Sequence, residues 1–178
     1  RAAGGVPAPR RRTVLVVGGS QGARGINRAV LKALPAIRHL VDRIAWIHIT
    51  GNAYKDAMEQ AYRTDGWDAR VFDFTGELPD LLAQWDLAIT RAGGTIVAEL
   101  SAIGVPSVLV PYPHHRDQHQ LHNAASLVDA GAARLIPEDR LGPEVIARLL
   151  EEVASGGEGL RAMEQAALGA ARPGAARA

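Results

Sequence analysis

Residues 13–24 read Thr13-Val14-Leu15-Val16-Val17-Gly18-Gly19-Ser20-Gln21-Gly22-Ala23-Arg24, an apolar, valine-rich run followed at once by a glycine-rich turn. A second stretch repeats this order: Asp86-Leu87-Ala88-Ile89-Thr90-Arg91-Ala92-Gly93-Gly94-Thr95-Ile96-Val97-Ala98-Glu99. Glycine lets backbone N–H groups approach a ligand closely, and a helix that begins there directs its positive dipole end at the ligand. Two such turns on one sheet predict a site for a diphosphate-bearing molecule.

Short β-branched runs alternate with helical ones along the rest of the chain. Strands are expected at Thr13–Val17, Ile44–Thr50, Ala69–Phe74, Leu87–Thr90, Ser107–Val110 and Arg134–Ile136. Helices are expected at Gly25–Leu40, Tyr54–Arg63, Leu78–Gln84, Thr95–Ile103, Gln118–Ala130 and Pro143–Val153, with a kink or restart at Pro35. This alternation predicts an α/β fold, a doubly wound Rossmann-like parallel sheet of about six strands in the order 3-2-1-4-5-6. Its ligand crevice would lie outside the carboxyl ends of the strands, where both glycine turns stand.

Composition limits the class of protein. The 178 residues suffice for one domain, and the 4% of aromatic residues predict a core of Val, Leu, Ile and Ala. A net charge of +1 argues against nucleic-acid binding as the main role, and the absence of cysteine excludes disulfides and thiolate metal sites. No apolar run reaches the about 18 residues of a membrane-spanning helix, and no signal pattern opens the chain, so a cytoplasmic protein is expected.

Three segments are expected. Residues 1–12 form a linker or tail, residues 13–153 form the ligand-binding domain, and residues 154–178 form an Ala/Gly/Arg-rich tail with a helix at Leu160–Leu168. The run Arg10-Arg11-Arg12 is interpreted as a solvated basic arm, with contact to anionic lipid or nucleic acid as the alternative.

The second glycine turn offers the more specific chemistry. Thr95 is placed to cap the helix or to donate its hydroxyl to a phosphate. Glu99 follows one helical turn later on the same face, where a carboxylate can accept hydrogen bonds from both hydroxyls of a ribose. The alternative is a glutamate that faces solvent on an amphipathic helix. Arg91 either assists the phosphate or forms a structural ion pair at the strand end.

The first glycine turn is less specific. It reads Gly18-Gly19-Ser20-Gln21-Gly22 and not G-x-G-x-x-G, and Ile49-Thr50-Gly51-Asn52 supply no acidic residue for an NAD ribose. It also lacks the Gly-Lys-Ser/Thr ending of a P-loop. By itself it fits phosphate binding and an ordinary strand-to-helix turn equally well.

A third polar run extends from Pro111 to Asn123 after the fifth expected strand. Its amide and imidazole groups suit hydrogen bonding to sugar hydroxyls. A metal site is an alternative, because His115 and His119 are spaced i, i+4, and a solvated loop is another. No glutamate stands between these two histidines, and the sequence contains no Asp-x-Asp pair that would hold a divalent metal ion. Neither a metal nor any other cofactor is therefore expected.

Several motifs in register resemble the C-terminal half of the MurG family of peptidoglycan glycosyltransferases. They are Gly18 to Arg24, His48-Ile49-Thr50-Gly51, Arg91 to Glu99, and Asp117-Gln118-His119-Gln120 with Asn123, within a region from Thr13 to Val153. The resemblance implies one half of a two-domain GT-B fold, in which the C-terminal domain holds UDP-GlcNAc and the N-terminal domain holds lipid I. It also implies an inverting, metal-independent hexosyltransferase that forms lipid II at the inner face of the cytoplasmic membrane, with a role in cell-wall biogenesis, cell division and cell shape.

The resemblance implies a role for each matching position. Ser20 and Gln21 would lie by the diphosphate, Phe74 and Thr75 would face uracil, the segment Gly93, Gly94, Thr95, Ile96, Val97 and Ala98 would surround the α-phosphate, Glu99 would hold the ribose, and His119 and Gln120 would hold GlcNAc hydroxyls. Two positions depart from the family. Ile96 stands where the family often has threonine, and Ile49 where it often has glutamine, so the part played by Thr95 at the phosphate is left open.

No acceptor-binding domain precedes Thr13, so the general base and the lipid I contacts are expected outside this chain. The chain alone is therefore not expected to catalyse transfer. One alternative is a standalone subunit that recruits a membrane-bound partner, an arrangement similar to the eukaryotic dolichol-linked GlcNAc transferase. A second alternative is a non-catalytic module that binds a nucleotide sugar.

Overall fold

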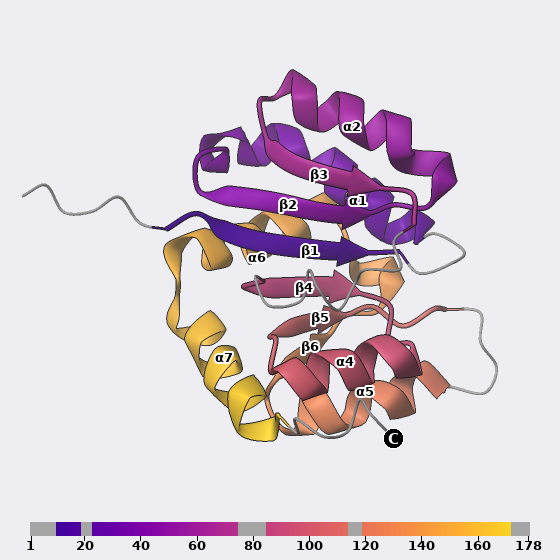
Figure 1. The fold of residues 1–178 in the computed structure, drawn as a ribbon, viewed down its shortest axis with the longest axis vertical. Helices are drawn as coiled ribbons and strands as arrows, with labels where there is room; N and C mark the ends of the chain where they lie inside the picture. Colours follow the sequence, from indigo (N-terminus) through magenta and orange to yellow (C-terminus); the bar gives the residue numbers. More distant parts are fainter. Residues whose placement is uncertain (1–9, 19–22, 75–84, 114–118, 172–178) are drawn as a thin grey trace, which may run out of the picture.

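Parallel strands form the centre of the molecule. The computed structural model describes residues 10–18, 23–74, 85–113 and 119–171. Within these residues the strands are β1 (Arg12–Val17), β2 (Ile44–Ile49), β3 (Asp68–Phe72), β4 (Leu87–Thr90), β5 (Ser107–Leu109) and β6 (Ala133–Leu135). They form one sheet in the order β3-β2-β1-β4-β5-β6, and every neighbouring pair is parallel (Figure 1). The expected fold class and strand order are confirmed.

Helices connect successive strands. The α-helices are α1 (Arg24–Ala33), α2 (Lys55–Thr64), α4 (Gly94–Ile103), α5 (His119–Asp129), α6 (Pro143–Ser155) and α7 (Glu158–Ala170), and the 3-10 helices are η1 (Leu34–Leu40), η2 (Asn52–Tyr54) and η4 (Glu138–Arg140). The helix expected at Gly25–Leu40 divides into α1 and η1 beside Pro35, whose missing N–H interrupts the hydrogen-bond ladder. Gly104 ends α4 with a φ of 76°, as a helix-terminating glycine does. The helix expected at Leu78–Gln84 lies outside the described residues.

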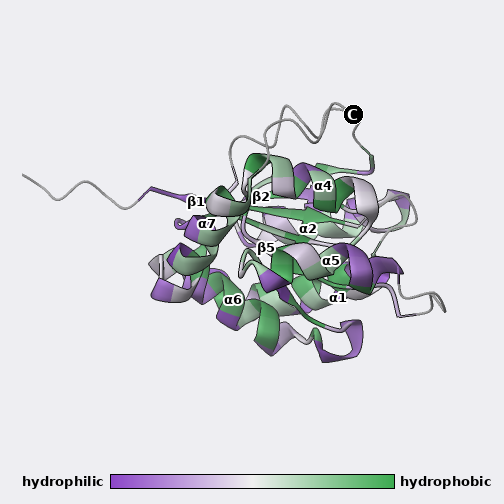
Figure 2. Ribbon diagram, turned by 90° about the horizontal axis from the view of Figure 1, so that it is seen from below, coloured by the Kyte–Doolittle hydropathy of each residue, from purple (hydrophilic) through white to green (hydrophobic). Residues whose placement is uncertain are grey.

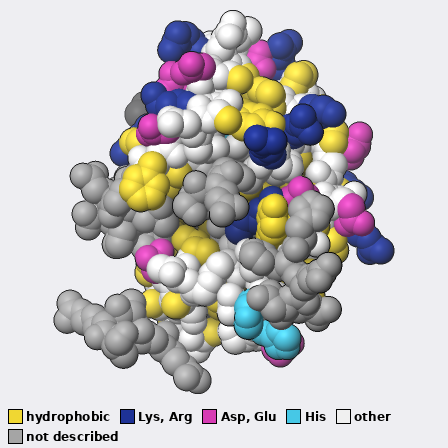
Figure 3. Space-filling view, turned by 90° about the vertical axis from the view of Figure 1, so that its right-hand side faces the viewer, with side chains coloured by type: hydrophobic (Ala, Val, Ile, Leu, Met, Phe, Trp, Pro, Cys, Tyr) yellow, Lys and Arg dark blue, Asp and Glu magenta, His cyan; other side chains and the backbone are white. Residues whose placement is uncertain are grey.

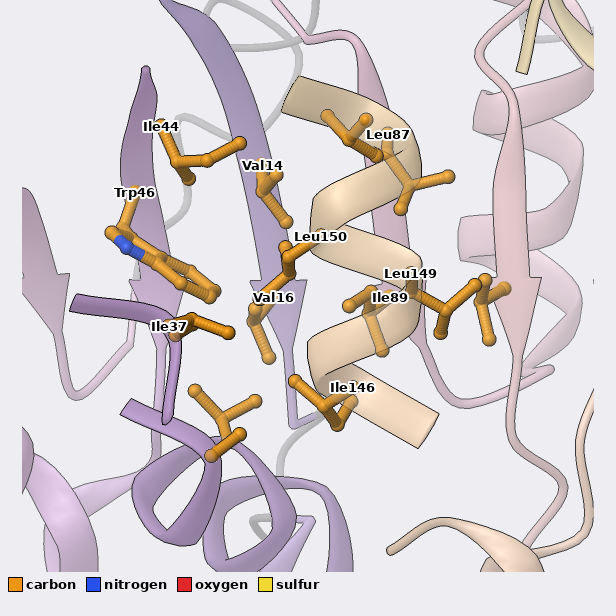
Figure 4. Packing of buried hydrophobic residues seen from close by; sticks show 14 of the residues in the cluster. Val14, Val16, Ile37, Ile44, Trp46, Leu87, Ile89, Ile146, Leu149 and Leu150 are labelled. Carbon is orange, nitrogen blue, oxygen red and sulfur yellow. The ribbon is translucent and has the colours of Figure 1, made fainter. Parts of the chain in front are cut away.

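The sheet is covered on both faces. Alternate residues of β1 point to opposite faces, so Val14 and Val16 join one apolar cluster while Leu15 and Val17 join the other. The first cluster packs the sheet against α1, η1, α2 and α6, and Figure 4 shows Ile146 of α6 in it. The second cluster packs the sheet against α4 and α5. Hydrophilic segments lie mainly at the periphery (Figure 2).

The region expected to be a C-terminal tail contributes to the core. α7 extends beyond the expected Leu160–Leu168 at both ends. Its Leu160 and Met163 are buried in the first cluster, and Ala167 is buried in the second. The sequence did not predict this packing, because in an alanine-rich segment the buried and exposed positions differ little in hydrophobicity and the helical periodicity is weak. None of the described helices combines the length and apolarity needed to cross a membrane.

The basic run at the start of the domain is paired. Arg12 is already the first residue of β1, and its guanidinium lies 2.6 Å from the buried carboxylate of Asp86. Arg10 pairs with the same carboxylate, which also accepts the Thr13 N–H at 2.8 Å. Arg11 lies 2.8 Å from Asp68. The expectation of a solvated arm is therefore wrong for Arg12, which is half-buried at the start of β1, whereas Arg10 and Arg11 are exposed as expected but are paired with carboxylates distant in sequence.

Candidate functional site

The carboxyl ends of the strands share one edge of the sheet, toward which the arrowheads point in Figure 1. Gly18 follows β1 there, and its N–H donates to the Ile49 carbonyl of β2 at 2.9 Å. Figure 3 looks onto this edge and shows basic side chains mainly toward the top, where Figure 1 places α2, and histidine side chains lower down. The second glycine turn leads away from this edge into α4, as expected, whereas residues 19–22 of the first turn lie outside the described residues.

The second turn presents backbone donors that have no hydrogen-bond partner among the described residues. Gly93 is the N-cap of α4 in an extended conformation, and Val97 donates the first intrahelical hydrogen bond, to the Gly93 carbonyl at 3.0 Å. The N–H groups of Gly94, Thr95 and Ile96 precede that bond and point out of the helix end. The expectation that Thr95 caps the helix is wrong, because the cap position falls two residues earlier and carries no side chain.

Three helices that begin at this edge share an electrostatic feature. Within the described helices, α1, α4 and α5 have no acidic residue in the first turn. By contrast, α2, α6 and α7 carry Asp56, Glu144 and Glu158 there. An acidic side chain in the first turn normally offsets the positive end of the helix dipole. These helices have no such residue of their own, although the carboxyl group of Glu138 on η4 lies against Gly25 in the first turn of α1.

The expected ribose residue lies in α4, beyond its first turn. Glu99 is half-buried one helical turn after the exposed Thr95. Burial raises the pKa of Glu99, and no neighbouring charge contributes to this shift. Ala98 is exposed, whereas the side chain of Val97 is buried in the core, so Val97 has only backbone to offer a ligand. Glu99 is thus a half-buried carboxylate that forms no ion pair with the other residues that the structure describes.

Arg91 forms the ion pair that was one of its two expected roles. Its guanidinium contacts the carboxylate of Glu138 on η4, and 11% of the Arg91 side chain is exposed. It also donates to the carbonyls of Val110 and Pro111 at 3.3 Å, and it lies 5.4 Å from the ring centre of Tyr112. These contacts occupy the guanidinium within the protein. A direct contact between Arg91 and a phosphate stays a prediction.

The start of α5 lies beside α4. The side-chain oxygen of Gln120 accepts the Tyr112 N–H at 2.8 Å, and the side-chain nitrogen of Asn123 donates to the Ala92 carbonyl at 3.1 Å. Asn123 therefore holds the glycine turn in place, a role the sequence did not reveal. His119 is exposed at the first position of α5.

A pocket of about 430 Å³ opens next to these residues. Gln120, Tyr112 and Leu121 line one side, and Glu138 and Asp139 line the other. Its size and mixed lining suit a sugar-sized ligand. A neighbouring hollow of about 410 Å³ runs along α1 and includes the basic residues Arg28 and Lys32, which sequence reasoning did not single out.

Several expected site residues remain untested. Phe74 follows β3 at the same edge and is 72% exposed, so its ring is accessible to a base. Ser20, Gln21 and Thr75 lie outside the described residues, as does His115 of the alternative metal pair. Among the residues that are described, no group of three or more His, Cys, Asp or Glu side chains is arranged to hold a metal ion.

The sequence profile of the glycosyltransferase family 28 C-terminal domain matches residues 13–177. The chain belongs to this family. The UDP-N-acetylglucosamine--N-acetylmuramyl-(pentapeptide) pyrophosphoryl-undecaprenol N-acetylglucosamine transferase of Myxococcus xanthus (strain DK1622) is 40% identical over 170 residues, which cover 96% of this chain and 44% of that relative. The enzyme of the same name from Anaeromyxobacter sp. (strain K) is 43% identical over 154 residues, covering 86% of this chain and 40% of the relative.

A solved structure supports the same family 28 assignment. The crystal structure of Acinetobacter baumannii MurG superposes with a TM-score of 0.79 and 30% identity, covering 97% of this chain and 51% of that one. The resemblance to the MurG family is confirmed. This family 28 domain spans less than half of the length of the two relatives, and these correspond to it through their C-terminal portion.

Proposed function

We propose that this chain binds UDP-GlcNAc as the donor half of a glycosyltransferase that transfers GlcNAc to lipid I and so forms lipid II. The names of the relatives and the match to the family 28 domain support this proposal. The observation that carries it is the pair of helices, α1 and α4, whose starts lack acidic residues and converge on one edge of the sheet. Such ends bind phosphate groups through backbone N–H donors.

Each part of the donor has a proposed contact. The N–H groups of Gly94, Thr95 and Ile96 bind the α-phosphate, and the carboxylate of Glu99 binds the ribose hydroxyls. Gln120 and His119, beside the 430 Å³ pocket, bind the GlcNAc hydroxyls. Four further assignments rest on the family resemblance alone: Ser20 and Gln21 at the diphosphate, and Phe74 and Thr75 at uracil.

The proposed reaction is a displacement at the anomeric carbon. A hydroxyl oxygen of the acceptor forms the new glycosidic bond, the bond to UDP breaks with its electron pair, and a general base takes the hydroxyl proton. We place that base, together with the lipid I contacts at the inner face of the cytoplasmic membrane, in the part of the relatives that this chain does not match. UDP gains negative charge as it leaves, which the N–H groups of α1 and α4 would stabilise. One such donor typically lowers a barrier by about 2.7–4 kcal/mol.

Calorimetric titration of the chain with UDP, UDP-GlcNAc and UDP-GalNAc tests the binding proposal. UDP and UDP-GlcNAc should bind, with UDP-GlcNAc preferred over UDP-GalNAc. No heat of binding with any of the three would overturn it. Transfer is tested by adding the N-terminal half of the Myxococcus xanthus relative and lipid I. Binding without transfer in that assay would instead favour a non-catalytic binding module.

A further inference from the structure

A buried histidine lies close to the first glycine turn. His48 is on β2, between Val16 of β1 and Val71 of β3, and its side chain is fully buried. Nδ1 lies 2.9 Å from the hydroxyl of Tyr62 on α2, and Nε2 lies 3.0 Å from Oδ1 of Asn27 on α1. Burial lowers the pKa of His48 to about 3, so the ring is neutral at physiological pH. The proposed reaction uses none of these groups.

The hydrogen bonds run in one direction. A carboxamide oxygen only accepts, so Nε2 of His48 carries the proton and donates it to Asn27. Nδ1 must then accept, and the Tyr62 hydroxyl is its donor. Asn27 in turn donates its side-chain N–H to the Thr50 carbonyl at 2.8 Å. The chain of donors is therefore Tyr62 to His48 to Asn27 to Thr50, with no charge in it.

This network of hydrogen bonds ends beside the proposed ligand site. Asn27 stands in the first turn of α1, and its own N–H donates the first intrahelical hydrogen bond, to Ala23 at 2.8 Å. Thr50 directly follows β2, and its N–H donates to Phe72 of β3 at 2.8 Å. The network thus fastens the start of α1 to the carboxyl end of β2. The N–H groups of Arg24, Gly25 and Ile26, which precede the first intrahelical bond, take their direction from this attachment.

We propose that His48, with Asn27 and Tyr62, is a positioning residue that aims the first turn of α1 at the diphosphate of the nucleotide sugar. This inference rests on the proposed function. The network sets the position of the helix start through neutral groups, so it adds no negative charge that would compete with the phosphates. It also leaves the geometry unchanged across the pH range in which histidine usually titrates.

A purely structural role makes a different prediction. Tyr62 also packs in an aromatic cluster. Its ring centre lies 5.4 Å from that of Trp46, and the ring centres of Trp46 and Trp67 are 5.8 Å apart. If the network only stabilised this core, its loss would lower stability and leave ligand affinity intact. Stability and affinity must therefore be measured separately.

Three changes to the network separate these quantities. His48→Phe leaves the Tyr62 hydroxyl and the Asn27 oxygen buried without partners, which is destabilising. The triple variant Asn27→Leu/His48→Phe/Tyr62→Phe replaces all three side chains by apolar ones. It leaves only the Thr50 carbonyl without its side-chain donor and should recover part of that stability. His48→Gln retains one donor and one acceptor and should restore part of the function. The control is Met163→Ala, a core truncation on α7 away from the network.

The readouts are the melting temperature and the calorimetric dissociation constant for UDP, measured where every variant is folded. Loss of one aimed donor to a charged phosphate predicts about ten-fold weaker UDP binding in His48→Phe and in the triple variant. Met163→Ala should lower the melting temperature without changing UDP affinity. Wild-type affinity in the triple variant would overturn the inference while leaving the proposed function intact. Failure of the wild-type chain to bind UDP would instead overturn the proposed function.

Discussion

Arg91 and Glu138 form an ion pair that links the second glycine turn to the loop after β6. Arg91 directly follows β4, and Glu138 begins η4. The carboxyl group of Glu138 also lies against Gly25, in the first turn of α1. This pair therefore connects the two turns from which the proposed phosphate contacts come.

Replacing Arg91 should destabilise the domain through its partner. Arg91→Met leaves the Glu138 carboxylate, 26% exposed, without its cation. We expect a loss of about 1–3 kcal/mol in the free energy of unfolding, measured by urea titration. Glu138→Gln in the Arg91→Met background should recover part of the loss, because no buried charge is then left unpaired. Strictly additive effects of the two changes would contradict the pairing.

Gly25 is required by the approach of Glu138. A Cβ atom at position 25 would overlap the carboxyl group of Glu138, which Arg91 holds in place. Gly25→Ala should therefore lower stability by about 1–3 kcal/mol. Gly169→Ala on α7 is the matched control, since a Cβ there meets nothing within 4 Å and alanine favours a helix by about 0.5–1 kcal/mol. If both alanines shift the melting temperature alike, Glu138 does not constrain position 25.

Glu99→Gln should separate stability from binding. Burial raises the folded-state pKa of Glu99, so the folded chain holds this proton more tightly than the unfolded chain does. The contribution of Glu99 to stability then falls as pH rises from the ordinary value of 4.5 through the raised folded pKa. Glutamine does not titrate, so the Glu99→Gln variant does not lose this stability as the pH rises. Its melting temperature should therefore match or exceed that of the wild type at pH 7. UDP affinity should nevertheless drop about ten-fold.

Glu151→Gln on α6 is the control for this experiment. It removes the same charge at an exposed position, where Oε1 of Glu151 lies 3.8 Å from Nε2 of His39. UDP affinity should be unchanged in this variant. Equal affinities for wild type and Glu99→Gln would remove Glu99 from the ribose site.

His119 should distinguish the sugar from the nucleotide. Because it begins α5 beside the pocket that Gln120 lines, His119→Ala should weaken binding of UDP-GlcNAc more than binding of UDP. Competition calorimetry with both ligands measures the ratio of the two dissociation constants. Asp129→Ala, at the far end of α5, should leave that ratio unchanged. A uniform loss for both ligands would argue against a sugar contact.

The sequence predicted the architecture because its signals are local. The strand-helix alternation from Thr13 to Val153 predicted the parallel sheet, and the doubly wound pattern predicted the strand order. The break expected at Pro35 and the helix end expected at Ile103 are both confirmed. The packing of α7 was missed because its buried residues are spread among alanines.

The site was less predictable because its contacts are distant in sequence. Arg91 had two possible roles until the fold brought Glu138 to it. The motif containing His48 was noticed, but its partners Asn27 and Tyr62 come from separate helices and no spacing rule connects them. Capping of α4 was one of two roles expected for Thr95, yet the N-cap of this helix is Gly93.

The proposed site binds the pyrophosphate through hydrogen-bond donors of the protein, without a metal ion. Titration of the chain with UDP in the presence of a chelator tests this most directly. We predict the same dissociation constant with chelator as with added magnesium ions. Binding that disappears with the chelator, or no binding under either condition, would contradict it.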